Sequence, residues 1–350
     1  MVRDLSLGAY KVFLRVDIRR VKCKNCKKVK RESIEDFLSN CRTTKLYMYF
    51  IGERCRESSV SAVASEQGLD WKTVKDLEKQ YMKEQLKVCP KPSPRVIGID
   101  EISIKKGHDY RIIVSDLESG MPIWFGGKGR TEKDMDEFYK DLGPERCSKI
   151  EIAVMDMWKA FRNSAEKNIP QAAILFDKFH VIKHLNESLD KVRKQEQKKL
   201  KDSGEEDYIK GNKYILLSKE ANLKSKGSES LAKLLKANER LNVAYLQKES
   251  FSQLWHYKNE LDARSFFDNW KKSLEDQKLP AFEKFAAMID KHWDGIVSYC
   301  TFGQDLKLGF VEGLNNKIRV IQRRAYGLKD EEYLKLKILT SKLPSLDLKL

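Results

Sequence analysis

The sequence lacks any apolar run of the roughly 18 residues that a membrane-spanning helix needs. Its first residues, Met-Val-Arg-Asp-Leu-Ser-Leu-Gly, have neither the basic start nor the apolar centre of a secretory signal peptide. Cysteine is scarce and odd in number, with seven scattered over 350 residues, which is typical of reduced thiols rather than of a disulfide framework. We therefore expect a protein of the cytoplasm with no membrane partner.

Acidic residues are too few to balance the basic ones. Lys and Arg number 68 and Asp and Glu 52, which gives a formal net charge of +16. Each Lys or Arg that neutralises a phosphate releases a condensed counterion, so a surplus of this size favours a nucleic-acid partner. The plainer alternative is a cationic surface without such a partner. The chain is long enough to form two or three domains, each with its own core.

A cysteine pair with the spacing of metal ligands lies near the start of the chain. Residues 10–22 alternate apolar with polar or basic side chains, and this period of two predicts a half-buried strand that leads into the pair Cys23 and Cys26. A structural zinc ion needs four ligands. The next cysteines, Cys41 and Cys55, fall in segments predicted to be helical. We therefore do not expect bound zinc.

A helix-turn-helix is predicted within residues 33–89, before three prolines between 90 and 94 interrupt the helical pattern. The first helix would turn Val60, Val63 and Ala64 inward, and a Gly-Leu-Asp turn would lead to a second helix with Val74 and Leu77 inward. Any small helical hairpin has this layout, which leaves a purely structural role open. In a DNA-binding unit, the residues facing the major groove would be Trp71, Lys72, Thr73 and Lys75.

Beyond the prolines the period changes from helical to strand-like. Three strands, a helix, a strand, a helix and a fifth strand are predicted in this order: 95–100, 110–116, 121–125, 131–142, 150–155, a helix that ends at 168, and 172–176. An antiparallel meander of three strands, extended by parallel strands through helical crossovers, is the ribonuclease-H-like arrangement. We therefore predict an α/β core with a mixed five-stranded sheet.

The rest of the chain has helical patterning. Residues 179–305 are rich in Lys, Glu and Leu, with Gly and Ser breaks near 203–204 and 226–228, and they predict a large all-α insertion. The aromatic residues of this segment recur at helical spacing, which favours core positions over base-stacking platforms. Residues 306–339 predict one or two basic amphipathic helices.

Acids stand at the carboxyl ends of four of the five predicted strands, and the candidate site residues among them are Asp100, at the end of the first, and Asp156, after the fourth. Side chains at the carboxyl ends of neighbouring strands can meet at one point. Carboxylate oxygens are ligands that Mg²⁺ prefers, and two such ions about 3.5–4 Å apart stabilise the attacking and leaving oxygens of a phosphodiester. An acid in this place is often only a turn residue or a helix cap, and this alternative stays open.

A third acid would have to come from a distant segment. Glu312 lies near the start of a predicted helix and is followed one turn later by Asn316. Such a helix could present a carboxylate to metal and its flank to DNA, although an acid in the first turn also simply complements the helix dipole. The basic residues on that flank, which would contact phosphates, are Lys317, Arg319, Arg323 and Arg324.

Four segments together resemble bacterial insertion-sequence transposases of the ISL-three group: Gly98-Ile-Asp-Glu101, Val154-Met-Asp-Met157, Phe176-Asp-Lys-Phe-His-Val181, and Val311-Glu-Gly-Leu-Asn-Asn-Lys317 through Arg323-Arg-Ala-Tyr-Gly327. The resemblance covers essentially the whole chain. It implies a ribonuclease-H-like domain interrupted by a helical insertion, with an Asp-Asp-Glu triad at Asp100, Asp156 and Glu312. It also implies a role near the active centre for Asp177 and His180.

The resemblance carries expectations about cofactors and partners. Two magnesium ions, or manganese in their place, would be bound, with Asp100 bridging both while Asp156 and Glu312 each complete one. The partner would be double-stranded DNA, namely the transposon's terminal repeats and the target, bound by a homodimer or larger assembly in the nucleoid region of a bacterial cytoplasm.

The sequence departs from the family pattern in two places. Leu308 stands where the family usually has Asn, a few residues before the triad Glu, which removes a polar side chain near the site. The family also begins with a zinc ribbon of two cysteine pairs, of which this chain carries one, Cys23 and Cys26. We expect a ribbon whose first half is missing.

These observations predict five parts: a partial zinc-ribbon-like segment 1–32, a helix-turn-helix domain 33–89, the first part of the core 95–184, the helical insertion 185–305, and C-terminal core helices 306–340 that carry the third acid. The predicted function is a DNA transposase that binds transposon ends and catalyses two-metal-ion cleavage and strand transfer. Two alternatives remain: a catalytically decayed copy that acts as a repressor or competitor, and a structure-selective nuclease on the same fold.

Overall fold

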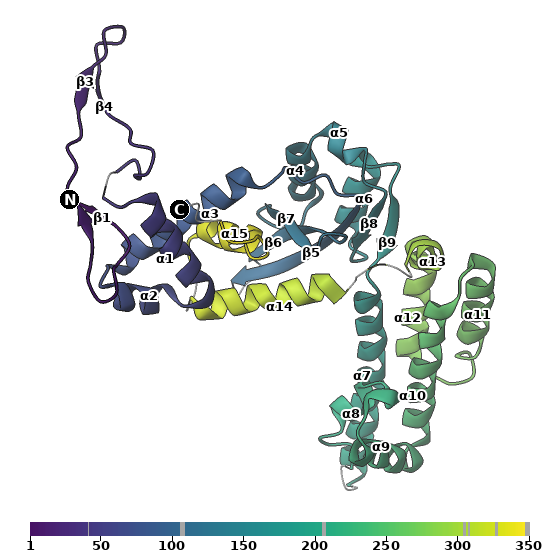
Figure 1. Ribbon diagram of the computed structural model, residues 1–350. Coiled ribbons are helices and arrows are strands. Elements are labelled where there is room, and N and C mark those ends of the chain that lie inside the picture. Colours follow the sequence, from purple (N-terminus) through teal and green to yellow (C-terminus); the bar gives the residue numbers. More distant parts are fainter. Residues whose placement is uncertain are drawn as a thin grey trace. The chain divides into compact units, whose positions relative to one another are not determined.

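The computed structural model describes residues 1–40, 42–105, 109–204, 208–303, 306, 309–325 and 328–346. Figure 1 shows the ribbon of the whole chain, coloured along the sequence. The chain divides into two compact units. The first contains Met1–Pro92, Met121–Phe125 and Glu312–Leu350, and the second contains Ser93–Gly120 and Gly126–Val311. The division falls inside one helix, α14 (Gly309–Arg324), between Val311 and Glu312.

Short strands open the first unit. Strand β1 (Val2–Arg3) pairs with β2 (Phe13–Leu14), and β3 (Arg20–Lys22) forms an antiparallel hairpin with β4 (Val29–Arg31). The prediction of one half-buried strand over 10–22 is therefore wrong. The alternating apolar residues have no broad sheet to pack against, and Val21 in the hairpin is 60% exposed.

Three helices form the body of the first unit: α1 (Lys45–Glu57), α2 (Val60–Gln67) and α3 (Trp71–Val88). The side chain of Asp70 caps α3, and Gly68 takes the left-handed conformation, with φ 61°, that the tight turn after α2 requires. The two helices and the turn predicted here are present, although the helical structure begins at 45 rather than at 33. Of the residues predicted to face inward, Val63, Ala64, Val74 and Leu77 are buried, and Val60 is partly buried against the same core.

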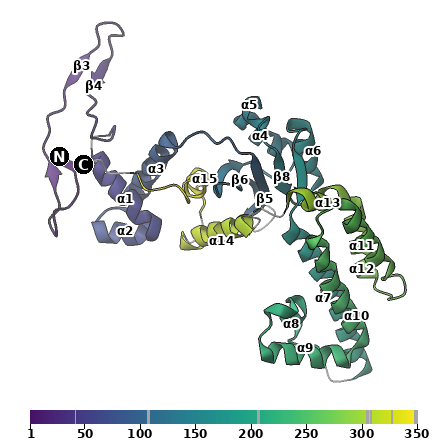
Figure 2. The ribbon, with the colours of Figure 1, turned by 45° about the vertical axis from the view of Figure 1, so that its right-hand side comes forward.

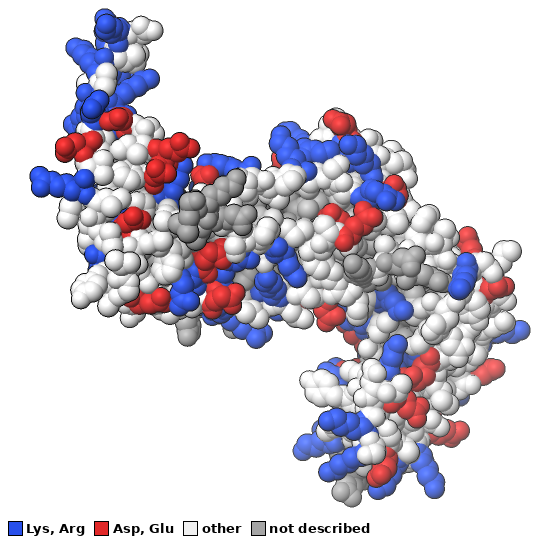
Figure 3. Space-filling view, in the orientation of Figure 1, with Lys and Arg blue, Asp and Glu red and all other residues white. Residues whose placement is uncertain are grey.

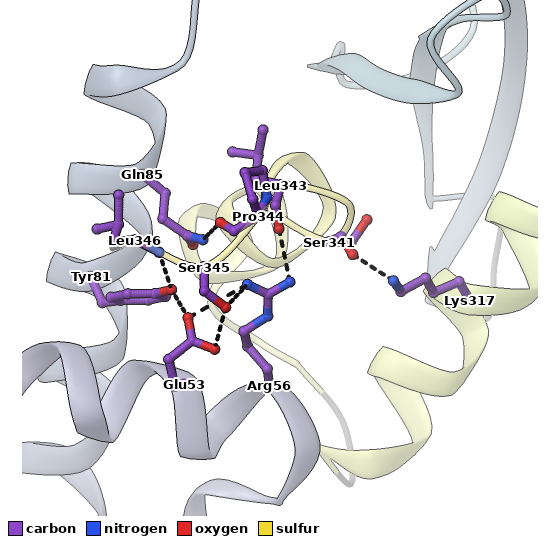
Figure 4. A network of polar contacts seen from close by, with 10 residues as sticks. All are labelled: Glu53, Arg56, Tyr81, Gln85, Lys317, Ser341, Leu343, Pro344, Ser345 and Leu346. Atoms are coloured by element: carbon purple, nitrogen blue, oxygen red, sulfur yellow. Dashed lines mark hydrogen bonds and ion pairs between the residues drawn. The ribbon is translucent and has the colours of Figure 1, made fainter. Parts of the chain in front are cut away.

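The C-terminal part of the first unit packs on these helices. Tyr333 and Leu336 of α15 (Glu331–Leu339) belong to the core formed by α1, α2 and α3. The segment that follows α15 is fixed by polar contacts, which Figure 4 shows. Arg56 donates to the Leu343 carbonyl at 2.8 Å, and Gln85 donates to the Pro344 carbonyl at 2.8 Å.

The central sheet is mixed and five-stranded, in the order β7-β6-β5-β8-β9, and four of its strands, β5, β6, β8 and β9, belong to the second unit. Strands β5 and β6 are antiparallel, whereas β5, β8 and β9 run parallel. The predicted sheet is thus confirmed. The strands are β5 (Val96–Lys105), β6 (Asp109–Asp116), β7 (Met121–Gly126), β8 (Ile152–Met155) and β9 (Ala173–Phe176).

The first of these strands is longer than predicted. Strand β5 continues for five residues beyond Asp100 and stays paired with β6 as far as Lys105 and Asp109. Its pairing with β8, in contrast, ends at Gly98 and Val154. Asp100 therefore lies within a hairpin strand that reaches past its parallel neighbour, and not at the end of its strand as predicted.

Helices α4 (Glu132–Leu142), α5 (Pro144–Cys147) and α6 (Lys159–Asn168) belong to the sheet domain. Thr131 caps α4 as predicted, through a capping box with Asp134. Val311, at the start of α14, packs with Val96, Leu117 and Val154 in a hydrophobic core cluster.

The described residues after β9 are helical, as predicted. The elements are α7 (Lys178–Ser203), α8 (Lys213–Leu217), η1 (Glu220–Asn222), α9 (Ser225–Ala237), α10 (Glu239–Phe251), η2 (Ser252–His256), α11 (Glu260–Lys272), α12 (Pro280–Lys291) and α13 (Trp293–Phe302). Helix α7 packs beside α10 and α12 (Figure 2). Its C-terminus at Gly204 agrees with the predicted break.

Two details of this insertion differ from the predictions. The break predicted at 226–228 is instead the first turn of α9, and the boundary predicted between 184 and 185 falls inside the continuous helix α7. The aromatic core is confirmed, because Phe267 and Trp270 are buried and stack on one another. Among the described helices, none combines the length and apolar character needed to cross a membrane.

Gly98 is a packing constraint that a substitution can test. A Cβ atom there would lie 2.8 Å from a methyl group of Leu117 and 3.0 Å from one of Val311. We expect Gly98→Ala to lower the free energy of unfolding by about 1–3 kcal/mol in urea titrations. Gly313→Ala is the matched control, since its Cβ would meet no atom within 4 Å and Ala favours a helix. Equal stability of the two variants would contradict this packing.

Candidate active site

Three acids follow the paired stretch of the parallel strands. The last pair that joins β5 to β8 is Gly98 and Val154, and Asp100 and Asp156 each come two residues later. The last pair that joins β8 to β9 is Met155 and Phe176, and Asp156 and Asp177 each come one residue later. Asp100 and Asp177 are both buried, each with 8% of its surface exposed.

A histidine from the first turn of α7 joins these acids. His180 Nδ1 lies 3.0 Å from Asp177 Oδ2, while Asp177 Oδ1 accepts a hydrogen bond from the Phe179 amide that begins the helix. The hydrogen bond with Asp177 raises the pKa of His180 to about 9 against the opposing effect of burial, and the charges of Asp156 and Asp100 contribute in the same direction. At neutral pH His180 is therefore a cation among carboxylates, and Asp177 acts as both its partner and a helix cap.

The third predicted acid, Glu312, lies in the first turn of α14, as predicted, and its side chain is exposed. It belongs to the first unit, whereas Asp100 and Asp156 belong to the second, so the convergence of all three stays a prediction. Within the part of the chain that the structure describes, no group of three or more His, Cys, Asp or Glu side chains has an arrangement that could hold a metal ion. Leu308 lies outside the described residues.

The oxygen donors of the second unit nevertheless suit a hard cation. Asp100 lies on β5 and Asp156 directly follows β8, and both side chains supply the carboxylate oxygens that Mg²⁺ prefers.

The residues predicted to face DNA on α3 are not equivalent. Trp71, Lys72 and Thr73 are exposed, as a groove-facing surface requires. Lys75 is instead half-buried and lies 2.8 Å from Asp330, the N-cap of α15. The sequence prediction for Lys75 overlooked this partner because Asp330 lies far along the chain.

Lys75 is the first of three lysines on one face of α3 that meet acids of the α15 start. Lys79 lies 3.3 Å from Asp330 and 2.6 Å from Glu332. Lys83 also lies 2.6 Å from Glu332. These contacts attach α3 to the C-terminal helix.

The basic residues of α14 divide in a similar way. Lys317 Nζ donates to the Ser341 carbonyl at 2.5 Å (Figure 4), and Arg324 donates to the Arg56 carbonyl at 3.3 Å. Arg319 lies 3.3 Å from the side-chain oxygen of Asn316, and both residues are exposed, as is Arg323. Lys317 and Arg324 thus have structural partners within the first unit, which the sequence pattern did not indicate.

The cysteine pair lies in the turn of the β3–β4 hairpin. Backbone N–H groups of Cys26 and Asn25 hydrogen-bond to Cys23 and lower the pKa of its thiol. Cys55, considered as a further ligand, is buried in the core of the first unit, and burial raises the pKa of its thiol to about 12. Cys41 lies outside the described residues.

One group beside the acids was missed at the sequence level. The Arg130 guanidinium stacks on both Trp158 and Tyr110, and Trp158 lies two residues after Asp156. The available signal was an aromatic residue two positions after a candidate acid, but the arginine and tyrosine come from segments that only the folded sheet brings together.

Comparison with known proteins decides the family. A family model described as "Transposase", of the ISL3 group with DDE chemistry, matches residues 97–338. The chain belongs to the ISL3-type transposases. The segment of this transposase that matches begins on β5, ends in α15 and contains Asp100, Asp156 and Glu312.

Curated relatives agree with this assignment. The transposase for insertion sequence element IS1001 of Bordetella parapertussis is 32% identical over 96% of this chain and 83% of the relative. The transposase for insertion sequence element IS1557 of Mycobacterium tuberculosis (strain ATCC 25618 / H37Rv) is 27% identical over 79% of this chain and 66% of the relative. Transposases of the DDE type generally use divalent metal ions.

The protonation of His180 in this transposase is testable. In metal-free protein we expect NMR titration to give His180 a pKa of about 9 and Asp177→Asn to lower it, because the main cause of the shift is lost. The pair of His180 and Asp177 makes its full contribution to the free energy of unfolding below about pH 6.5, and this contribution is lost as the pH rises through about 9. Glu187→Gln, which removes the equivalent partner of His184, should leave His180 unchanged. A His180 that titrates below 7 in the wild type would exclude this geometry.

The contact between α3 and α15 predicts an acid-dependent stability. The ion pair with Lys75 lowers the pKa of Asp330 to about 2, so its contribution is present above about pH 4 and is lost as the pH falls through about 2. Asp330→Asn keeps a capping side chain but removes the charge. In urea titrations at pH 7 we expect this variant to have a free energy of unfolding lower than that of the wild type by on the order of 1 kcal/mol. The difference should shrink as the pH falls toward 2. Asp76→Asn is the control at an exposed position of α3, and its stability relative to the wild type should not change in this way with pH. If Asp330→Asn is still less stable than the wild type at pH 2, the ion pair is not the cause of its lower stability.

Proposed function

We propose that this transposase binds the ends of its own insertion sequence and cleaves and joins DNA at a centre formed by Asp100, Asp156 and Glu312. The observation that supports the proposal is the parallel register of β5 and β8, whose last pair, Gly98 and Val154, lies two residues before Asp100 and Asp156. Asp100 would hold two Mg²⁺ ions, with Asp156 and Glu312 each completing one. Bound there, the ions would activate the attacking oxygen and stabilise the leaving oxygen of the scissile phosphate.

The position of α14 supports the role of Glu312. Val311 packs where a Cβ at Gly98 would lie, on the strand that bears Asp100. Gly98 and Asp100 are two residues apart, so their side-chain directions share one face of β5. Glu312 follows Val311 directly on the same helix.

His180 has a positioning and electrostatic role in this proposal. Its positive charge offsets part of the repulsion among Asp100, Asp156 and Asp177 when these are ionised. Its hydrogen bond also holds the side chain of Asp177, which directly follows β9 and caps the start of α7.

Basic surfaces support the binding of transposon ends. The β3–β4 hairpin carries eight exposed Lys and Arg residues and no acid between 19 and 31, and Figure 3 shows basic side chains gathered on this hairpin. On α3, Trp71, Lys72 and Thr73 are exposed at the start of the helix that a helix-turn-helix would insert into the major groove. We propose that this helix reads the terminal repeats while the hairpin contacts phosphates.

Because two transposon ends have to be joined, we propose that a dimer or larger assembly of this chain acts on DNA in the cytoplasm. Zinc is not part of the proposal.

Carboxamide variants test the triad directly. With Mg²⁺ and a duplex that carries the ends of the element, we expect Asp100→Asn, Asp156→Asn and Glu312→Gln each to reduce cleavage at least about 100-fold while DNA binding persists. Glu151→Gln is the control, since Glu151 precedes β8 and pairs with Arg95 at the opposite end of the strand.

Three results would contradict the proposal. Wild-type protein that binds the ends without cutting them would indicate a decayed copy that acts as a competitor. Nicking of branched DNA regardless of sequence would indicate a structure-selective nuclease. Full activity of Glu312→Gln would remove Glu312 from the centre.

A further inference from the structure

An aromatic and cationic stack lies at the same end of the sheet as the acids. The Arg130 guanidinium carbon is 4.3 Å from the ring centroid of Trp158 and 4.9 Å from that of Tyr110. Three separate segments supply these residues: the loop after β7, the residue before α6, and strand β6. All three residues belong to the second unit, together with Asp100 and Asp156.

Polar contacts hold the stack in place. The Trp158 indole N–H donates to the Arg130 carbonyl at 2.8 Å, and Arg130 lies 2.8 Å from Glu101. Glu101 directly follows Asp100 on β5, and Trp158 lies two residues after Asp156. The stack is therefore tied to the same end of these strands, with Glu101 and Tyr110 on the face of β5 and β6 opposite to that of Asp100.

The stack is also open to solvent. Trp158 is 40% exposed and the Arg130 side chain 38% exposed. Arg130 covers one face of the indole ring, and the exposed remainder of a rigidly held ring loses little conformational freedom when another flat ring stacks on it. The Arg130 guanidinium, which also pairs with Glu101, supplies positive charge for a phosphate.

We propose that Trp158 and Arg130 form a stacking site for an unpaired nucleobase of the DNA strand held at the acidic centre. The base would stack on Trp158, and Arg130 would contact the phosphate of the same nucleotide. The site is tolerant of sequence, because every base has a flat face. This inference rests on the proposed function for the identity of the polymer, and it adds a strand-positioning site that the triad does not contain.

The test compares two DNA probes in metal-free buffer, where no cleavage takes place. One probe is a duplex with a short single-stranded thymidine overhang, and the other is the same duplex with blunt ends. We expect the wild type to bind the overhang probe more tightly in fluorescence anisotropy. Trp158→Leu, which keeps apolar bulk but has no flat face, should reduce this preference by about 5- to 100-fold.

Two further variants separate stacking from a structural effect. Trp158→Phe retains an aromatic face and should keep most of the preference. Tyr214→Ala is the matched control, because Tyr214 is likewise exposed beneath a cation, Lys213, but lies in the insertion away from the stack. It should leave the preference unchanged. Circular dichroism melts of each variant show whether the fold is intact.

The outcomes distinguish this site from the proposed function. A wild type without overhang preference, or a Trp158→Leu variant that folds and keeps it, overturns the stacking site even if the protein cleaves DNA. Loss of the preference in Trp158→Leu with rescue by Trp158→Phe supports the site even if no cleavage is found with Mg²⁺.

Discussion

The parallel register of β5, β8 and β9 is the constraint on which the site depends. Backbone hydrogen bonds fix Gly98 beside Val154 and Met155 beside Phe176, and Asp100, Asp156 and Asp177 follow these pairs by one or two residues. A slip of one residue would turn an aspartate to the other face of the sheet. Core packing on the same strands, including the close approach of Val311 to Gly98, opposes such a slip.

Burial and charge then determine how the carboxylates of Asp100, Asp156 and Asp177 are stabilised. Carboxylates held close together repel one another unless a cation is present. His180 supplies one such charge from the start of α7. In a family that generally uses divalent metal ions, the carboxylate oxygens of Asp100 and Asp156 are donors that suit such an ion.

Local patterns predicted the sheet well, because alternation and buried runs directly reflect strands and helices. The order of the five strands, the Thr131 cap and the turn at Gly68 follow from the sequence. Partners from distant segments did not follow from it. The contact of Lys75 with Asp330 and the stack of Arg130 on Trp158 depend on tertiary packing, which no local period encodes. The strand predicted over 10–22 failed because alternation alone does not supply a partner surface.

The most direct test of the account is a crystal structure of the protein bound to its transposon-end DNA and Mn²⁺, with anomalous scattering used to locate the metal. We predict two anomalous peaks about 3.5–4 Å apart, with Asp100 in contact with both and with Asp156 and Glu312 each in contact with one. Peaks coordinated by other residues, or a Glu312 carboxylate that contacts neither ion while DNA occupies the site, would contradict the central claim.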